Sequence, residues 1–289
     1  MIKLKNIKSL YVHGGEFHTD DVCVAAFLEL CLGSADVFGI IRGFNPPDDV
    51  EAENAGILVA DIGDGQFDHH SVPREMRVNG VPYAAFGKVV RSFWAESGLF
   101  SGRDAYKRFD SDFIQELDLL DNEGPSVLKG VRQHFWSIIS SLNPIWDDKN
   151  TLEIQMQQFH KATAIAKVAI EAAIHTANSA VLAEKIVKDN LKNANDGILV
   201  LNQIVDYQAA LAETEIKWII MPSSRGGWNV ISVMDREGKN KGLFPVRFRG
   251  KRNSELEDLC PGMEFCHASG FMAQFKTKEL ALQAMKSIF

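Results

Sequence analysis

The sequence is poor in cysteine and lacks any long apolar run. Four cysteines occur in 289 residues, and none forms the closely spaced pair typical of zinc sites, so we expect reduced packing residues. No stretch of about 18 apolar residues occurs, and the amino-terminal segment lacks the apolar region of a signal peptide. These absences argue against a membrane protein or a disulfide-stabilised secreted protein, and a cytoplasmic location is expected.

What remains is the composition of an ordinary globular protein. Hydrophobic residues make up 46% and charged residues 24% of the chain, and the net charge is −7. A chain of this size lies near the length at which one hydrophobic core stops growing, so two domains are expected. The change in pattern along the chain predicts a first domain over residues 1–195 and a second over residues 196–289.

Strands and helices are expected to alternate in the first part of the chain. Strands are predicted at 8–13, 37–43 and 56–64, and helices at 20–32 and 48–55. This order predicts an α/β fold in which a mainly parallel sheet is flanked by helices.

The rest of the first domain and the tail differ in pattern. Further helices are predicted at 84–98, 103–122, 126–142 and 151–194. Strands are then predicted at 197–203, 216–222, 228–235, 244–249 and 263–271, before a closing helix at 276–288. The tail is therefore expected to form a smaller α+β domain that makes a cleft with the first.

Histidine and aspartate gather where two predicted strands end. Half of the eight histidines lie in the first 70 residues, each close to a carboxylate. The two clusters comprise His13, His18, Asp20 and Asp21, and then Asp61, Asp68, His69 and His70. Because open α/β sheets bind ligands beyond the carboxyl ends of their strands, both clusters are expected at one edge of the sheet.

Mixed carboxylate and imidazole ligands suit manganese, magnesium, iron or cobalt better than structural zinc. A later acidic pair, Asp118 and Asp121, lies three residues apart on one face of a predicted helix. Asp118 is preferred as a ligand and Asp121 is the second choice. Together these side chains would suffice for two metal ions, an arrangement that suits hydrolysis of a phosphoester or phosphoanhydride.

Six segments follow one another along the chain: HGGEFHTDD, ADIGDGQFDHH, PYAAFGKVV, ELDLLDNEG, GILVLNQ and HASGFMAQFKTKELALQAM. In this order they resemble motifs of the melanocyte-proliferating-gene (MYG) family, a branch of the DHH phosphoesterase superfamily. The resemblance implies a DHH-type fold. Family members are described as metal-dependent 3′ to 5′ RNA exonucleases, and were earlier labelled metal-dependent protein hydrolases.

The resemblance also implies roles for individual residues. The metal ligands would be His13, His18, Asp20, Asp61, His69 and Asp118. Asp68 and His70 would be neighbouring active-site residues that orient ligands or meet the substrate. The cofactor would be two divalent ions, manganese first and magnesium second, and the substrate RNA, a short oligonucleotide or a nucleotide.

The carboxyl-terminal motif departs from the family pattern. Residues 272–275 replace a glycine pair, and side chains there are expected to obstruct a phosphate-binding loop. An alternative is therefore a non-catalytic regulatory protein that binds metal and nucleotide. The expected substrate-binding residues are Arg247, His267, Ser269 and Lys276. The oligomeric state stays open, a homodimer included.

Overall fold

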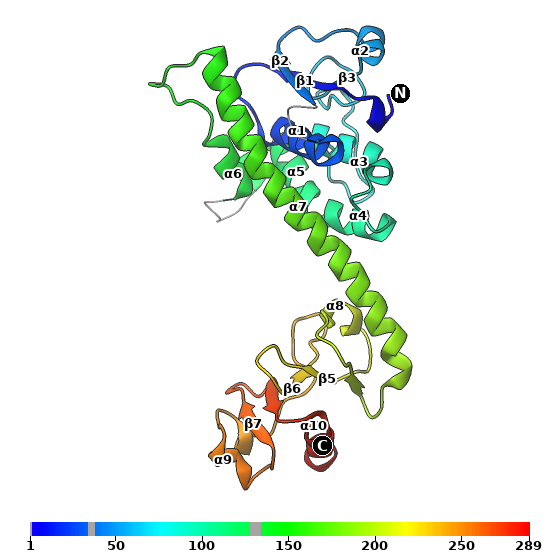
Figure 1. Ribbon diagram of the computed structural model, residues 1–289, viewed down its shortest axis with the longest axis vertical. Helices are drawn as coiled ribbons and strands as arrows, with labels where there is room; N and C mark the ends of the chain where they lie inside the picture. Colours follow the sequence, from blue (N-terminus) through cyan, green and yellow to red (C-terminus); the bar gives the residue numbers. More distant parts are fainter. Residues whose placement is uncertain (1, 34–37, 128–133) are drawn as a thin grey trace. The chain divides into compact units, whose positions relative to one another are not determined.

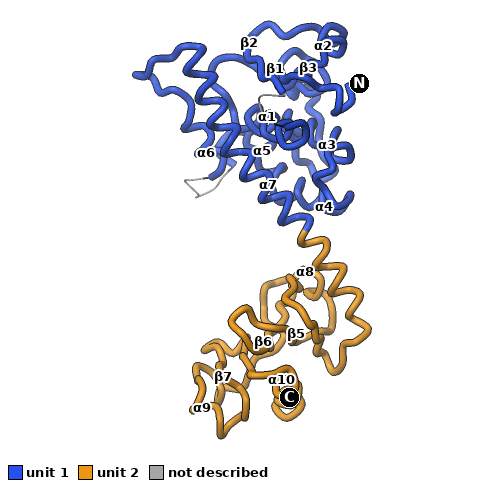
Figure 2. The backbone as a smooth tube through the Cα atoms, in the orientation of Figure 1, with its two compact units in different colours: residues 1–178 blue, residues 179–289 orange. Residues whose placement is uncertain are grey.

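The computed structural model describes residues 2–33, 38–127 and 134–289. The chain forms two compact units, residues 1–178 and residues 179–289, shown in different colours in Figure 2. The boundary between the units falls within a long helix, upstream of residue 195. The functional division of the chain near residue 195 stays a prediction.

Unit 1 contains a three-stranded parallel sheet. Its strands are β1 (Ser9–His13), β2 (Gly39–Gly43) and β3 (Ile57–Val59), in the order β2-β1-β3. The three middle residues of the central strand β1 are all buried, Leu10 and Val12 completely, as a parallel strand covered on both faces requires. The α/β class with a parallel sheet and flanking helices is therefore confirmed.

Helices connect and cover the strands of unit 1 (Figure 1). They are α1 (Thr19–Leu32), α2 (Asp49–Ala55), α3 (Ala85–Ser97), α4 (Arg103–Phe109), α5 (Gln115–Glu123), α6 (Phe135–Ser140) and the first part of α7 (Leu152–Asn190), which continues into unit 2. Helix α1 is buried from its first residue to Leu28, so it runs through the core of the unit. No helix within the described ranges is both long and apolar enough to span a membrane.

The helix predicted at 103–122 is continuous but contains an irregular turn. This π-helical turn, Asp110–Ile114, joins α4 to α5 directly. Within the helix predicted at 126–142, the structure describes α6 from Phe135 to Ser140, and residues 128–133 lie outside the described residues. Hydrophobic spacing located these helices but gave no sign of the extra residue in the turn.

The amino terminus of α3 holds two carboxylates from other helices. The first helical residues have no acceptor within the helix for their backbone N–H groups. Ala85 N–H and Phe86 N–H donate to the two oxygens of Asp20 on α1, at 2.9 and 2.8 Å. Gly87 N–H donates to Asp118 on α5 at 3.1 Å. These bonds fasten α1, α3 and α5 together beneath the edge of the sheet.

Unit 2 is built around a five-stranded mixed sheet. Its strands are β4 (Ile198–Val200), β5 (Trp218–Pro222), β6 (Trp228–Ser232), β7 (Met263–Cys266) and β8 (Met272–Phe275), in the order β4-β5-β6-β8-β7. Its helices are α8 (Gln208–Leu211), α9 (Ser254–Glu257) and α10 (Lys278–Ile288). The side chain of Thr277 caps α10 by accepting from Leu280 N–H.

Two expectations for unit 2 were wrong. Residues 244–249 are not a strand, because Val246–Phe248 forms a 3₁₀ turn after Pro245. Residues 272–275 are not a loop but strand β8, paired with β6 and β7, and Ala273 on it is fully buried. The Ala273 side chain packs into the core. Contrary to the expectation, it therefore does not obstruct a phosphate.

Replacing Gly87 with alanine is expected to destabilise unit 1, although the same change in an ordinary helix stabilises by about 1 kcal/mol. A Cβ at this position would overlap the Asp118 carboxylate and approach Arg77 Nη2 to 2.8 Å. We expect a loss of about 1–3 kcal/mol in the free energy of unfolding, measured by urea denaturation. Ser92→Ala on the same helix is the control, and a stabilised Gly87→Ala protein would contradict the packing described.

Candidate metal centre

Seven side chains from five segments converge at the carboxyl edge of the unit 1 sheet. They are His13 at the end of β1, His18 at the amino cap of α1, Asp20 and Asp21 in its first turn, Asp61 after β3, His69 in the following loop, and Asp121 on α5. Asp61 has a backbone φ of 60°, a conformation that residues other than glycine rarely adopt. Such strained residues concentrate at functional sites, where the fold holds a side chain in a required direction.

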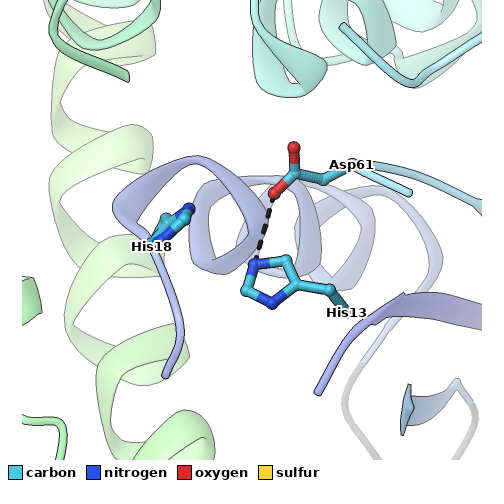
Figure 3. Close-up of side chains that lie close together, drawn as sticks. All are labelled: His13, His18 and Asp61. Carbon is cyan, nitrogen blue, oxygen red and sulfur yellow. Dashed lines mark ion pairs between the residues drawn. The ribbon is translucent and has the colours of Figure 1, made fainter. Parts of the chain in front are cut away.

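His13 presents one ring nitrogen to two carboxylates. Its Nδ1 lies 2.9 Å from the carbonyl oxygen of Gly14, which only accepts, so Nδ1 carries the hydrogen. Its Nε2 therefore has a free lone pair in the neutral ring, and lies 3.2 Å from Asp21 Oδ2 and 3.4 Å from Asp61 Oδ2. Figure 3 shows the His13 ring directed at Asp61, with His18 beside them.

His69 occupies the equivalent position on the other side of Asp61. Its Nε2 lies 2.9 Å from Asp61 Oδ1 and 3.0 Å from Asp121 Oδ2. His18 Nδ1 lies 3.9 Å from the other oxygen of Asp121. Asp61 thus stands between the two histidines and offers one oxygen to each.

The converging atoms lie close together but do not satisfy one another. Buried atoms without a properly directed hydrogen bond among the described residues include His13 Nε2, His69 Nε2 and both carboxylate oxygens of Asp21 and of Asp61. Buried polar atoms are nearly always hydrogen-bonded, so a set of orphans in one place requires an explanation. Candidate ligand atoms fall into three groups, each within 4.8 Å: His13, His18 and Asp61; Asp61, His69 and His70; and Asp20, His69 and Asp121. These residues fit a divalent cation.

The charges of the site point the same way. Burial lowers the pKa of His13 and of His69, but the neighbouring carboxylates outweigh it and raise these values to about 9 and about 11. Burial also raises the pKa of Asp21 to about 8 and that of Asp20 well above its usual value, and nearby acids add to the rise for both. Without a cation, the cluster therefore holds protons in its place.

Asp118 lies outside this cluster. It is fully buried and accepts from Arg77 Nη2 at 2.6 Å in addition to Gly87 N–H. Arg77 also binds Asp110 and donates to the carbonyl of Pro82. The structure thus places Asp121, the second choice from the sequence, among the converging groups, and gives Asp118 to a buried ion pair.

Asp68 and His70 form a pair beside the cluster. His70 Nδ1 lies 2.7 Å from Asp68 Oδ1, which also accepts from the backbone N–H of His70. Burial opposes ionisation of Asp68, but the hydrogen bonds from His70 and Asp64 lower its pKa overall. Asp68 is buried and His70 exposed, so the carboxylate fixes a ring that reaches solvent.

The four residues expected to bind substrate lie in unit 2 and have separate surroundings. His267 and Ser269 meet in a tight turn, with Nδ1 and Oγ 2.8 Å apart. Lys276 Nζ lies 3.6 Å from Glu257, and the Arg247 guanidinium lies over the ring of Phe248. Arg247 is on the 3₁₀ turn rather than on the expected strand.

A family model named MYG1_exonuc and described as an uncharacterised protein family (UPF0160) matches residues 9–288. The chain belongs to this family. The MYG1 protein of Dictyostelium discoideum is 26% identical, and the match covers 97% of this chain and 96% of the relative. The MYG1 exonuclease of Mus musculus is 22% identical, and the match covers 95% of this chain and 83% of the mouse protein. Among solved structures, RecJ of Thermus thermophilus in complex with Mn²⁺ has a TM-score of 0.30 and 12% identity, covering 98% of this chain and 52% of RecJ.

The sequence of this MYG1-family chain did not predict Asp21 as a metal ligand, although Asp21 belongs to the first polar cluster. Its side chain is completely buried, and both oxygens lack a hydrogen bond among the described residues. The sign in the sequence that Asp21 belongs to the site was its position next to the predicted ligand Asp20. Consecutive residues in the first turn of a helix point about 100° apart, so Asp20 reaches α3 while Asp21 faces His13.

Binding of a divalent metal to this MYG1-family protein is expected to release protons. His13 and His69, with pKa values of about 9 and about 11, are protonated at neutral pH in the metal-free protein and must lose those protons to act as ligands. Affinity for Mn²⁺ should therefore rise from about pH 6 to about pH 8. Calorimetric titration in two buffers of different ionisation enthalpy measures the protons released, and a value of zero would contradict this reading of the cluster.

Proposed function

We propose that this protein is a 3′ to 5′ exonuclease or oligonucleotide phosphodiesterase that uses two divalent cations, manganese in preference to magnesium. The coarser conclusion, a metal-dependent hydrolase of the phosphoesterase type, rests on family membership and on the converging ligand atoms. Relatives in Mus musculus and Rattus norvegicus carry the name MYG1 exonuclease, which supports a nucleic acid as substrate.

The position of Asp61 is the observation that carries the proposal. One of its oxygens approaches His13 and the other approaches His69. With a carboxylate shared in this way, His13, His18 and Asp21 would hold one cation. Asp20, His69 and Asp121 would hold the second. When bound, two cations so placed would neutralise the charge that develops as a phosphoester is cleaved.

Asp68 and His70 are assigned to the substrate. Asp68 fixes the ring of His70 through Nδ1, which leaves Nε2 to hold or deliver a proton at a phosphate oxygen. A hollow of about 240 Å³ adjoins this ring and is lined by His18, His69, His70, Arg74 and Asp121, among others. The Arg74 guanidinium, paired with Glu123 at the surface, would add positive charge for a phosphate group.

Arg247, His267, Ser269 and Lys276 are proposed to bind the nucleic acid from unit 2. His267 Nδ1 is occupied by Ser269, whose backbone N–H also donates to it at 3.2 Å, so the Nε2 side of the ring is the one offered to a ligand. The reason for the non-catalytic alternative is weaker than the sequence indicated, because residues 272–275 form a strand in which Ala273 lies in the core and the Gln274 side chain donates to the carbonyl of Gly226.

The test is digestion of 5′-labelled single-stranded RNA and DNA by the full chain, with Mn²⁺, Mg²⁺ or chelator. Shortening from the 3′ end with metal, and none with chelator, is expected. Nucleotide binding without turnover under every divalent metal would replace the proposal with the regulatory alternative.

Asp121→Asn and Asp118→Asn should behave differently. Loss of a carboxylate among the converging groups is expected to lower kcat/KM by about 100-fold or more and to weaken Mn²⁺ binding. Asp118→Asn should instead lower stability, because it removes a charge opposite the buried Arg77, while the amount of bound metal is retained.

Nuclease assay, metal titration and urea denaturation of both variants separate these effects, with the exposed Asp104→Asn as control. Loss of metal from Asp118→Asn with full binding by Asp121→Asn would reverse the assignment.

A further inference from the structure

A second pocket in unit 1 is lined by basic and aromatic side chains and shares no residue with the metal centre. Its volume is about 720 Å³, within the range of about 300–1,000 Å³ typical of small-molecule sites. Its wall includes Arg77, Arg91, Trp94, Arg103, Tyr106 and Lys107. Helices α3 and α4, which supply most of these side chains, can be followed in Figure 1.

Two of the four cationic side chains of the pocket have no acidic partner among the described residues. Arg77 is neutralised by Asp110 and Asp118, and Arg91 pairs with Glu75. The side chains of Arg103 and Lys107 are exposed and have no hydrogen-bond or ion-pair partner within the part of the chain that the structure describes. They lie four residues apart on α4 and therefore on one face of it.

The aromatic side chains give the same pocket flat apolar walls. The rings of Trp94 and Tyr106 stack with an interplanar angle of 7° and centroids 5.1 Å apart. The guanidinium carbons of Arg77 and Arg91 lie 3.8 and 4.3 Å from the centroid of the Tyr83 ring. Because these rings face one another or the two arginines, a ligand meets the outer apolar surface of the stacked pair of Trp94 and Tyr106. A small inorganic anion would use the free cations but not this surface, whereas a planar group joined to an anion would use both.

We propose that this pocket binds a nucleoside monophosphate, with its phosphate at Arg103 and Lys107 and its base against Trp94 and Tyr106. A phosphomonoester carries about −1.5 to −2 charges at neutral pH, which matches the two free cations. Mononucleotides are also the products of an exonuclease. Binding in this pocket does not depend on hydrolysis, so it stands apart from the proposed function.

The test is calorimetric titration of the full chain with each of the four common ribonucleoside 5′-monophosphates, in chelator so that metal and turnover do not contribute. At least one is expected to bind, and the double variant Arg103→Ala/Lys107→Ala should weaken binding about tenfold or more. Arg103→Gln/Lys107→Gln, which keeps long polar side chains, should give the same loss. The matched control, Lys149→Ala/Lys161→Ala, removes the same charge from exposed positions outside the pocket and should bind as the wild type does.

Two further ligands define the specificity. Inorganic phosphate should bind about tenfold more weakly than the nucleotide, because it cannot use the aromatic walls. A 5′-phosphorylated oligonucleotide that displaces the mononucleotide would identify the terminus of a strand as the source of the group, whereas failure to displace it identifies the free nucleotide. The proposal is overturned if no nucleotide binds in chelator, if phosphate binds equally well, or if the control loses affinity as the pocket variant does.

Discussion

The amino terminus of α3 is the constraint on which the metal centre depends. Its first N–H groups have no partner within the helix, and Asp20 and Asp118 accept from them. The positive end of the helix dipole favours carboxylates at this point. Because Asp20 belongs to α1 and Asp118 to α5, these bonds fix the two helices that carry Asp21 and Asp121 to the edge of the sheet.

This arrangement buries more negative charge than the protein itself can balance. Asp20, Asp21 and Asp61 are all almost inaccessible, and burial raises the pKa of the first two. Asp61 is the exception, because the facing imidazoles of His13 and His69 outweigh burial and lower its pKa. The central carboxylate, Asp61, thus keeps its charge while Asp20 and Asp21 retain protons. A divalent cation would displace those protons and balance the charge.

The sequence alone predicted which residues meet in the site where the order of strands and helices determines their positions. His13 and Asp61 come together because parallel strands β1 and β3 end at the same edge, and alternating strands and helices reveal such an order. The choice between Asp118 and Asp121 depends instead on Arg77, which comes from a segment between β3 and α3 with no periodic pattern. In unit 2, the sequence MAQF could not show a strand, because its pairing is with segments distant in the chain.

The π-helical turn between α4 and α5 contributes to the contacts that link the helix of Asp121 to the wall of the basic pocket. Its first residue, Asp110, and Asp118 on α5 both reach the guanidinium of Arg77, whose side chain forms part of the pocket wall. A single arginine therefore holds the helix of Asp121 from one side while it faces the pocket on the other. π-helical turns recur at functional sites. We interpret the extra residue of this turn as the feature that directs the carboxylates of Asp110 and Asp118 toward the Arg77 guanidinium.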